Sequence, residues 1–441
     1  MKKELRTAGK AIVITIVITL INLGLLVLAF CLPTQTMRQH LAESYPLIES
    51  ESQYMQWAQG YTSSMMDFWS EYTLYGAAIN EDAQGNAFER AMMMWYIDTP
   101  GLERDKAVEQ YARYPEEHFE LTAYPRYWNG AVIIMKFLLL VFTLPDIRML
   151  NMFLNLTLLA VVIALMAKKN MVLELICFIT TVFFINPITM IFSVMFSAEY
   201  IPMLVSIIAI LLVGKWIDSK EGGWEIFFAI TGCVVSFFSF LSSPFIALGI
   251  PLVFLLWVTN EKAAVKKVAF SSCYWAVSYG ITWGVKWIVC TLFTSYNLLA
   301  DVFNRVDIYE NAENAENSGT TLIERFMHNF WVYKTPAFMI LYVLAIIFII
   351  VVIYSWRKSG RLRETVQKNA AATGNKADVV AGYVLVALIP FVITIALGNG
   401  YAYNHYFMAH RNFSITVLAS LCIIWKLIVY LSDLRNHKYK H

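Results

Sequence analysis

Two acidic residues in MMDFWSEY, residues 65–72, have a spacing that could support chemistry. Asp67 and Glu71 lie four positions apart, and residues at this spacing share one face of a helix. Two neighbouring carboxylates raise each other's pKa or bind a cation, and either arrangement suits a general base that deprotonates a hydroxyl. A solvated acidic face within an acidic loop is the alternative, which the spacing does not exclude.

A third acidic residue, Glu199, is the only acid in NPITMIFSVMFSAEYIPM, residues 186–203, in which Asn186 and Pro187 break the preceding span. A lone carboxylate at membrane depth is costly, so it indicates a functional site. The alternative is an interfacial glutamate at the start of a helix, where the helix dipole favours negative charge. The sequence demands no cofactor, although a divalent cation, Mg²⁺ or Mn²⁺, is possible because paired carboxylates such as Asp67 and Glu71 bind cations.

Basic and aromatic residues surround the apolar run 128–144 and could bind a lipid-linked phosphate. Arg126 and Tyr127 precede the run, Lys136 lies within it, and Arg148 follows it. Arginine and lysine at the membrane surface pair with phosphate groups. Snorkelling at the end of a span is the alternative for Arg126 and Arg148. Lys136 is harder to explain in that way, because it lies in the middle of an apolar helix.

A polar segment between two apolar runs, GNGYAYNHYFMAHRNF at 398–413, supplies further candidates for substrate binding. Its aromatic, amide, imidazole and guanidinium groups suit sugar stacking and phosphate pairing, and the residues concerned are Asn404, His405, His410 and Arg411. The alternative is an aromatic belt at the membrane interface with a few polar loop residues.

The elements that must position these residues are membrane helices. The chain of 441 residues is 58% hydrophobic and only 15% charged, and its mean hydropathy of +0.55 is too high for a soluble protein of this length. We predict an all-α protein of about ten spans, each near the 20 residues that a bilayer requires. The predicted spans are 10–32, 148–167, 171–189, 197–214, 224–242, 246–259, 268–293, 336–356, 379–397 and 413–431.

The distribution of basic residues predicts the topology. If 126–144 crossed the membrane, most of the lysines and arginines after residue 148 would lie outside, against the positive-inside rule. We therefore expect a re-entrant or juxtamembrane helix at 126–144, an outer segment at 33–147, middle spans at 148–356 and a basic cytoplasmic linker at 357–378. The tail 1–9 and the end of the last region, 379–441, are then both cytoplasmic, around a single integral-membrane domain.

This layout resembles the GT-C superfamily of integral-membrane glycosyltransferases. In that group a first span leads to an outer loop with a catalytic acid, juxtamembrane helices follow, and an Arg-led span precedes a second acidic motif. Here Asp67 and Glu71 stand at the first acid, and RYWNGAVIIMKFLLLVF stands at the juxtamembrane helix. DIRMLNMFLNLTLLAVVIALMAKK matches the Arg-led span, and SAEY with Glu199 stands at the second acid. The resemblance covers roughly residues 1–215.

The resemblance implies a compact bacterial enzyme of the plasma membrane that decorates cell-envelope polysaccharide. Its partners would be the lipid bilayer, a polyprenyl-phosphate-linked sugar and a glycan acceptor, with no nucleic acid. A carboxylate, best Asp67, would deprotonate the acceptor hydroxyl for an inverting attack on the anomeric carbon. A lipid donor also needs no cytoplasmic nucleotide site, and the sequence contains no Walker A or Rossmann motif.

Three other functions are compatible with the sequence, and one of them is a non-enzymatic assembly factor for which Asp67 and Glu199 would be dispensable. A polysaccharide polymerase or ligase acting on lipid-linked glycans would depend on His410 and Arg411 more than on the acids. A transporter or flippase of lipid-linked sugars would show internal symmetry and broken helices at mid-membrane, and we find no internal repeat.

Overall fold

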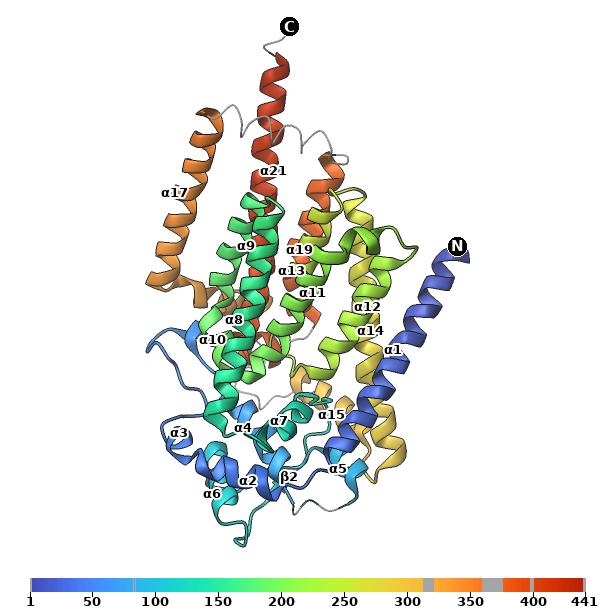
Figure 1. The fold of residues 1–441 in the computed structure, drawn as a ribbon, viewed down its shortest axis with the longest axis vertical. Helices are drawn as coiled ribbons and strands as arrows, with labels where there is room; N and C mark the ends of the chain where they lie inside the picture. Colours follow the sequence, from blue (N-terminus) through green and yellow to red (C-terminus); the bar gives the residue numbers. More distant parts are fainter. Residues whose placement is uncertain are drawn as a thin grey trace.

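The computed structural model describes residues 2–81, 83, 85–311, 321–358, 376–396 and 400–438. The chain is 77% helical with almost no strand, which agrees with the predicted all-α class. Its long helices form a bundle, and the segment between the first two long helices covers one end of that bundle (Figure 1). We call this segment, residues 30–143, the cap.

A helix overlaps each of the ten predicted span ranges. These helices are α1 (Lys2–Ala29), α8 (Leu144–Lys168), α9 (Val172–Ile185), α11 (Val194–Asp218), α12 (Gly223–Phe238), α13 (Ile246–Val258), α14 (Ala264–Phe293), α17 (Pro336–Lys358), α19 (Lys376–Ala396) and α21 (Ser414–Lys438). Six stretches of the described chain are long and apolar enough to cross a membrane, namely α1, α8, α11, α14, α19 and Tyr406–Leu427. Six such helices fit a multi-pass membrane protein, and a count of about ten stays a prediction.

The cap is built from short helices with a core of their own. They are α2 (Gln35–Glu43), α3 (Tyr45–Glu49), the 3₁₀ turn η1 (Thr62–Ser64), α4 (Phe68–Ile79), α5 (Ala87–Met93), α6 (Arg104–Arg113) and α7 (Ala131–Leu139). Strands β1 (Tyr96–Ile97) and β2 (Leu121–Thr122) pair in antiparallel register. Leu41, Tyr72, Tyr75, Val108 and Tyr111 are fully buried in this core. Burial of large apolar side chains therefore holds α4 at the centre of the cap.

Helix α7 is the structured part of the stretch predicted at 126–144. Its nine residues extend only about 14 Å at 1.5 Å per residue, too short for a hydrocarbon layer of about 30 Å. Gly130 precedes it, and the Gly130 amide donates to the Phe237 carbonyl at 2.9 Å. A Cβ at this glycine would lie 2.3 Å from the Phe237 ring, so only glycine permits this approach to α12.

The chain breaks at Asn186 and Pro187, as the sequence predicts. Asn186 ends α9 in the left-handed region with φ of 62° and caps the short helix α10 (Pro187–Phe192). The turn after α10 leads directly into α11, which carries Glu199.

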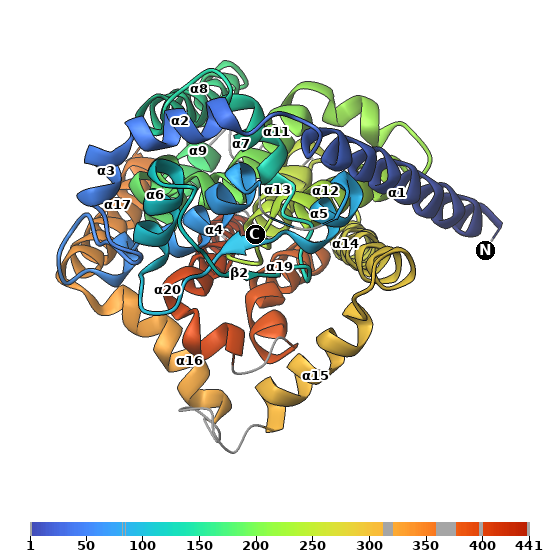
Figure 2. The ribbon, with the colours of Figure 1, turned by 90° about the horizontal axis from the view of Figure 1, so that it is seen from below.

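The remaining elements lie around the bundle. They are α15 (Leu298–Asn311), α16 (Leu322–Trp331), the 3₁₀ turns η2 (Val332–Lys334) and η4 (His410–Phe413), the π-helical turn η3 (Gly400–Asn404) and α20 (Tyr406–Ala409). Figure 2, viewed from the cap end, shows α15 and α16 at the periphery, on the side opposite α2 and α8. Both chain ends point away from the cap (Figure 1). Most of the predicted linker 357–378 lies outside the described residues.

Candidate active site

Asp67 directly precedes helix α4. Its Oδ1 accepts a hydrogen bond from the Ser70 amide at 3.2 Å, so Asp67 is the N-cap and only Glu71 lies within the helix. The prediction that both acids lie on one helical face is therefore wrong for Asp67, because an aspartate before an apolar run satisfies the free amides of the first turn better than it extends the helix. The Asp67 side chain is buried, with 2% exposed.

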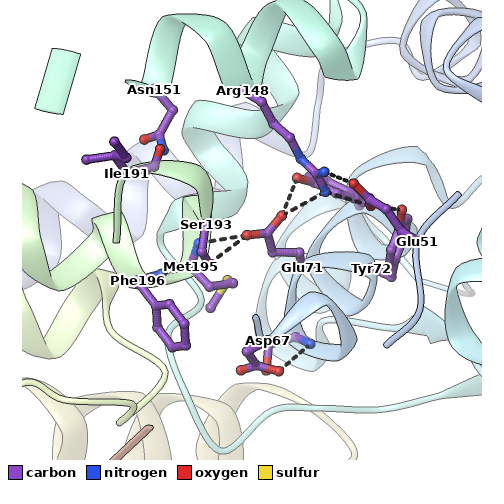
Figure 3. Close-up of polar contacts among 12 residues, drawn as sticks. Glu51, Asp67, Glu71, Tyr72, Arg148, Asn151, Ile191, Ser193, Met195 and Phe196 are labelled. Carbon is purple, nitrogen blue, oxygen red and sulfur yellow. Dashed lines mark hydrogen bonds and ion pairs between the residues drawn. The ribbon is translucent and has the colours of Figure 1, made fainter. Parts of the chain in front are cut away.

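Glu71 is held by donors from three parts of the chain. Its Oε1 accepts from the Ser193 hydroxyl at 2.8 Å and from the Met195 amide at 3.4 Å. Its Oε2 accepts from the Tyr75 hydroxyl at 3.0 Å and from Arg148 at 3.4 Å. Figure 3 shows Glu71 directed toward this network, whereas Asp67 lies apart from it. Glu71 thus joins α4 to the turn between α10 and α11.

Arg148 forms its ion pairs with acidic residues of the cap. It forms a two-pronged ion pair with Glu51, in which one nitrogen–oxygen distance is 2.9 Å, and Glu51 also accepts from the Tyr72 hydroxyl at 2.8 Å. The Arg148 guanidinium lies 4.3 Å from the Phe68 ring centroid. These contacts position α8 against the cap and give Arg148 a structural role, where the sequence suggested phosphate binding or snorkelling. Glu51 was not a sequence candidate, because nothing local distinguishes it from the other acids of the cap.

Burial controls the protonation of both cap acids. Loss of water raises the pKa of Glu71 from 4.5 to about 7, although Ser193 and Tyr75 donate to the carboxylate and oppose the shift. Burial also raises the pKa of Asp67, while Ser70 and the positive charge of Arg411 lower it. A carboxylate whose pKa is raised toward neutral is a stronger base than an ordinary aspartate, which suits proton abstraction from a hydroxyl.

Arg411 is within electrostatic range of two acids that lie far apart in the sequence. It is fully buried, and its guanidinium interacts electrostatically with both Asp67 and Glu199. Its hydrogen bonds go to the carbonyls of Phe407 at 2.8 Å, Ser63 at 3.2 Å and Ile185 at 3.3 Å. A buried guanidinium with carbonyl partners keeps its charge, so Arg411 stabilises negative charge at either carboxylate.

Glu199 organises the loop between α12 and α13. Its Oε1 accepts from the Ser239 hydroxyl at 2.5 Å, and its Oε2 accepts from both the amide and the hydroxyl of Ser243 at 2.6 Å. The Tyr401 hydroxyl donates to the Ser242 carbonyl of the same loop at 3.1 Å. Sequence reasoning did not select these serines as partners of Glu199. Their only sign in the sequence is that SFLSSP places polar residues at the end of an apolar run.

The buried lysines bind helix ends. The Lys136 ammonium donates to the Ala78 carbonyl, in the last turn of α4, at 2.6 Å. Lys286 donates to the Met92 carbonyl, at the end of α5, at 2.7 Å. A cation at a helix C-terminus satisfies free carbonyls and complements the helix dipole. Burial lowers the pKa of Lys136 to about 8. In this structure Lys136 thus stabilises α4 and does not face a phosphate site.

Arg126 and Tyr127 lie beside the α12–α13 loop. Arg126 is partly exposed and pairs with Asp301 at 3.4 Å. The Tyr127 ring is nearly parallel to the rings of Phe240, at a centroid separation of 6.3 Å, and Trp283, at 5.6 Å. Because this loop also binds Glu199, Arg126 and Tyr127 belong to the same region as the acids.

Of the remaining sequence candidates, two are exposed and one is buried. Asn404, the last residue of η3, and His405, which directly precedes α20, are both exposed. His410 is fully buried beside Arg411, and its Nδ1 lies 3.0 Å from the Tyr406 carbonyl. Within the described part of the chain, no three His, Cys, Asp or Glu side chains gather closely enough to hold a metal ion.

An apolar groove of about 450 Å³ runs along the cap end of the bundle between α7, α8, α11 and α12. Its walls include Ile134, Leu154, Ala198, Val205 and Phe238. Ile134, Leu154 and Val205 are each 48% exposed, so the groove opens on the surface of helices that are apolar enough to contact lipid.

The groove reaches both acidic centres. Val194 lines it, and the neighbouring residues Ser193 and Met195 donate to Glu71. Phe238 also lines it and directly precedes Ser239, which donates to Glu199. A chain lying in the groove would therefore end near the buried carboxylates.

Comparison with known proteins identified no matching family model, no similar curated protein and no similar solved structure.

Proposed function

We propose that this protein is a membrane glycosyltransferase of the GT-C type. It moves a sugar from a polyprenyl-phosphate carrier to a hydroxyl of a cell-envelope glycan, with inversion, on the face of the membrane that the cap covers. The observation that carries the proposal is the position of Arg411, which is fully buried, donates to the Ser63 carbonyl of the cap and the Ile185 carbonyl of α9, and lies within electrostatic range of Asp67 and Glu199. Convergence of three charged groups from distant segments is typical of an active site.

Asp67 is the general base in this proposal. Four donors hold Glu71 and three hold Glu199. Among the described contacts, Asp67 accepts hydrogen bonds only from Ser70 in its own helix turn. Asp67 is therefore the carboxylate most available to a substrate hydroxyl, and the other two position the elements around it.

The proton, the two bonds and the leaving group of this reaction can all be accounted for. Asp67 takes the proton of the acceptor hydroxyl, and the oxygen bonds to the anomeric carbon on the face opposite the phosphate. The bond between the anomeric carbon and the phosphate oxygen breaks, and the lipid phosphate leaves with the electron pair. Arg126 is partly exposed and can exchange Asp301 for this phosphate, while the buried carboxylates favour the positive charge that develops at the anomeric carbon.

The apolar groove supports a lipid donor. It is open to the bilayer, it lies at the cap end of α8 and α11, and it ends at residues next to the acids. A polyprenyl chain lying there would leave its phosphate and sugar at the junction of cap and bundle. The walls of the groove are almost entirely hydrocarbon, which matches an isoprenoid chain.

Release of polyprenyl phosphate tests the proposal without knowledge of the sugar. Purified protein is incubated with a panel of polyprenyl-monophosphate sugars and an envelope-glycan extract. Asp67→Asn removes the base and is expected to slow release by about 100-fold or more. Glu116→Gln, an equal charge change at an exposed cap residue, is the control. Unchanged release by Asp67→Asn would contradict the assignment of the base, and no release by the wild type from any donor would contradict the function.

One observation favours a second candidate, a polymerase or ligase that joins lipid-linked glycans. The centre of the site is the cation Arg411, with His410 buried beside it. For that reaction Arg411→Lys would abolish turnover while Asp67→Asn would retain most of it. The glycosyltransferase proposal expects Asp67→Asn to be the more damaging change.

A further inference from the structure

A row of five aromatic side chains joins the cap to the α12–α13 loop and to α14. It consists of Trp69, Tyr124, Tyr127, Phe240 and Trp283, and we call it the aromatic row. All five are partly exposed, whereas most aromatic side chains of the cap core are buried. The five residues come from α4, from the loop before α7, from the α12–α13 loop and from α14. Because these segments are distant in the sequence, only the folded protein brings the five rings together.

The rings of the row contact one another in sequence. Trp69 meets Tyr124 edge to face, with ring centroids 6.4 Å apart. Tyr124 and Phe240 are nearly parallel at 6.3 Å, and Tyr127 and Trp283 are nearly parallel at 5.6 Å. The row is therefore a continuous surface, not a set of isolated side chains.

Two members of the row are near residues of the proposed catalytic centre in the sequence. Trp69 is two residues after Asp67, and Phe240 directly follows Ser239, which donates to Glu199 at 2.5 Å. The Trp69 ring is also fixed from behind, because the Arg104 guanidinium lies 4.0 Å from its centroid. The Arg104 guanidinium is itself held by hydrogen bonds to Thr73 and Asp98 at 2.7 and 3.0 Å. A ligand lying along the row would thus pass the proposed base.

The orientation of Trp283 argues against a simple membrane-interface belt. In such belts the indole N–H points toward lipid headgroups and water. Here the Trp283 Nε1 donates to the Arg126 carbonyl at 2.7 Å, so the polar edge is turned into the protein. What remains exposed is apolar ring surface, beside the charged pair Arg126 and Asp301.

We propose that the aromatic row binds the acceptor, and that the acceptor is a carbohydrate chain. The C–H faces of pyranose rings pack on aromatic rings, while their hydroxyls bond to charged groups at the margin such as Arg126 and Asp301. This inference rests on the proposed glycosyltransferase function and adds the place where its glycan acceptor binds. Acceptor rings lying along the row bring one hydroxyl to Asp67.

Saturation-transfer NMR on the full-length protein in micelles tests binding directly. The probes are short linear oligosaccharides of glucose, galactose and mannose. Wild type is expected to bind at least one of them, and Trp283→Leu or Phe240→Leu to weaken that binding by about tenfold. Trp283→Tyr keeps a ring and should retain most of the binding. Trp57→Leu removes a 44% exposed tryptophan outside the row and serves as the control. Thermal unfolding midpoints establish that each variant is folded.

Two outcomes would overturn the proposal. One is oligosaccharide binding that folded Trp283→Leu and Phe240→Leu leave unchanged. The other is no binding by the wild type, together with quenching of tryptophan fluorescence by brominated phospholipid that Trp283→Leu measurably reduces, which would make the row a lipid-facing belt. The polyprenyl phosphate assay separates the two proposals, because release of the carrier by the wild type without oligosaccharide binding would contradict only the acceptor inference.

Discussion

Asp67 and Glu71 are four residues apart and have different surroundings. Asp67 caps α4 and accepts only from Ser70 among the described residues, so its carboxylate can still accept a proton from a substrate. Glu71 is fully buried and joins the cap to Ser193 and Arg148. At the scale of single residues, the acid with fewer partners is the one that the proposed reaction uses as base, and the acid with more partners determines where α4 lies.

Glu71 should make the stability of the protein depend on pH. Its pKa is about 7 in the folded protein and 4.5 in the unfolded chain, so the folded state holds the proton more tightly between these values. Stability should therefore fall as pH rises through this window, by about 3 kcal/mol at most, and stay constant above it. The unfolding midpoint in detergent measures this fall, and Glu71→Gln should reduce it. An equally steep fall in that variant would mean that another group titrates.

At the scale of elements, α4 is secured at both ends. Asp67 satisfies an amide at its start, and Lys136 of α7 satisfies the Ala78 carbonyl in its last turn. Likewise, Lys286 of α14 donates to the Met92 carbonyl at the end of helix α5. Each lysine thus couples one cap helix to a neighbouring helix, which accounts for charges inside apolar sequence.

Removal of the Lys136 contact should affect stability and not turnover. Lys136→Ala leaves the Ala78 carbonyl buried without its donor, at a cost of about 2 kcal/mol. The unfolding midpoint should fall, while the donor KM of the protein that stays folded should not change. A rise in donor KM with an unchanged midpoint would instead support the phosphate-binding role that the sequence suggested. Lys286→Ala, with the same kind of contact, provides the comparison.

At the scale of the molecule, the cap covers one end of the bundle and both chain ends point away from it (Figure 1). The groove and the charged centre lie where cap and bundle meet. This arrangement keeps lipid, sugar and acceptor at one surface of the membrane, which the proposed reaction requires.

Cysteine labelling tests the predicted orientation. Glu116 is exposed on the cap, and Lys220 is exposed in the turn between α11 and α12 at the other end of the bundle. After replacement of the exposed Cys31 and Cys273 by serine, a membrane-impermeant maleimide should label Glu116→Cys in intact cells. Lys220→Cys should react only after permeabilisation. The reverse pattern would place the cap in the cytoplasm and exclude an outer-face reaction.

The sequence alone determined the class of protein and several breaks in the chain. Apolar runs predicted the helices of the bundle, because hydropathy acts on each segment separately. Asn186 and Pro187 predicted the end of α9, because their effects on the backbone are local. Asp67, Glu199 and Arg411 were also selected as candidates from the sequence, since charges next to apolar sequence are costly, and their role in catalysis stays a prediction.

Only the tertiary structure decided what each charged residue contacts. Arg411 bonds to the Ser63 carbonyl across 348 positions of sequence, and Glu71 bonds to Ser193 across 122. The Glu51 partner of Arg148 and the serine partners of Glu199 are equally remote from any local pattern. A buried charge is satisfied by whichever polar group the packing of the helices brings to it. That packing depends on all the apolar contacts of the chain together, so no single motif could reveal which acid stays available to a substrate.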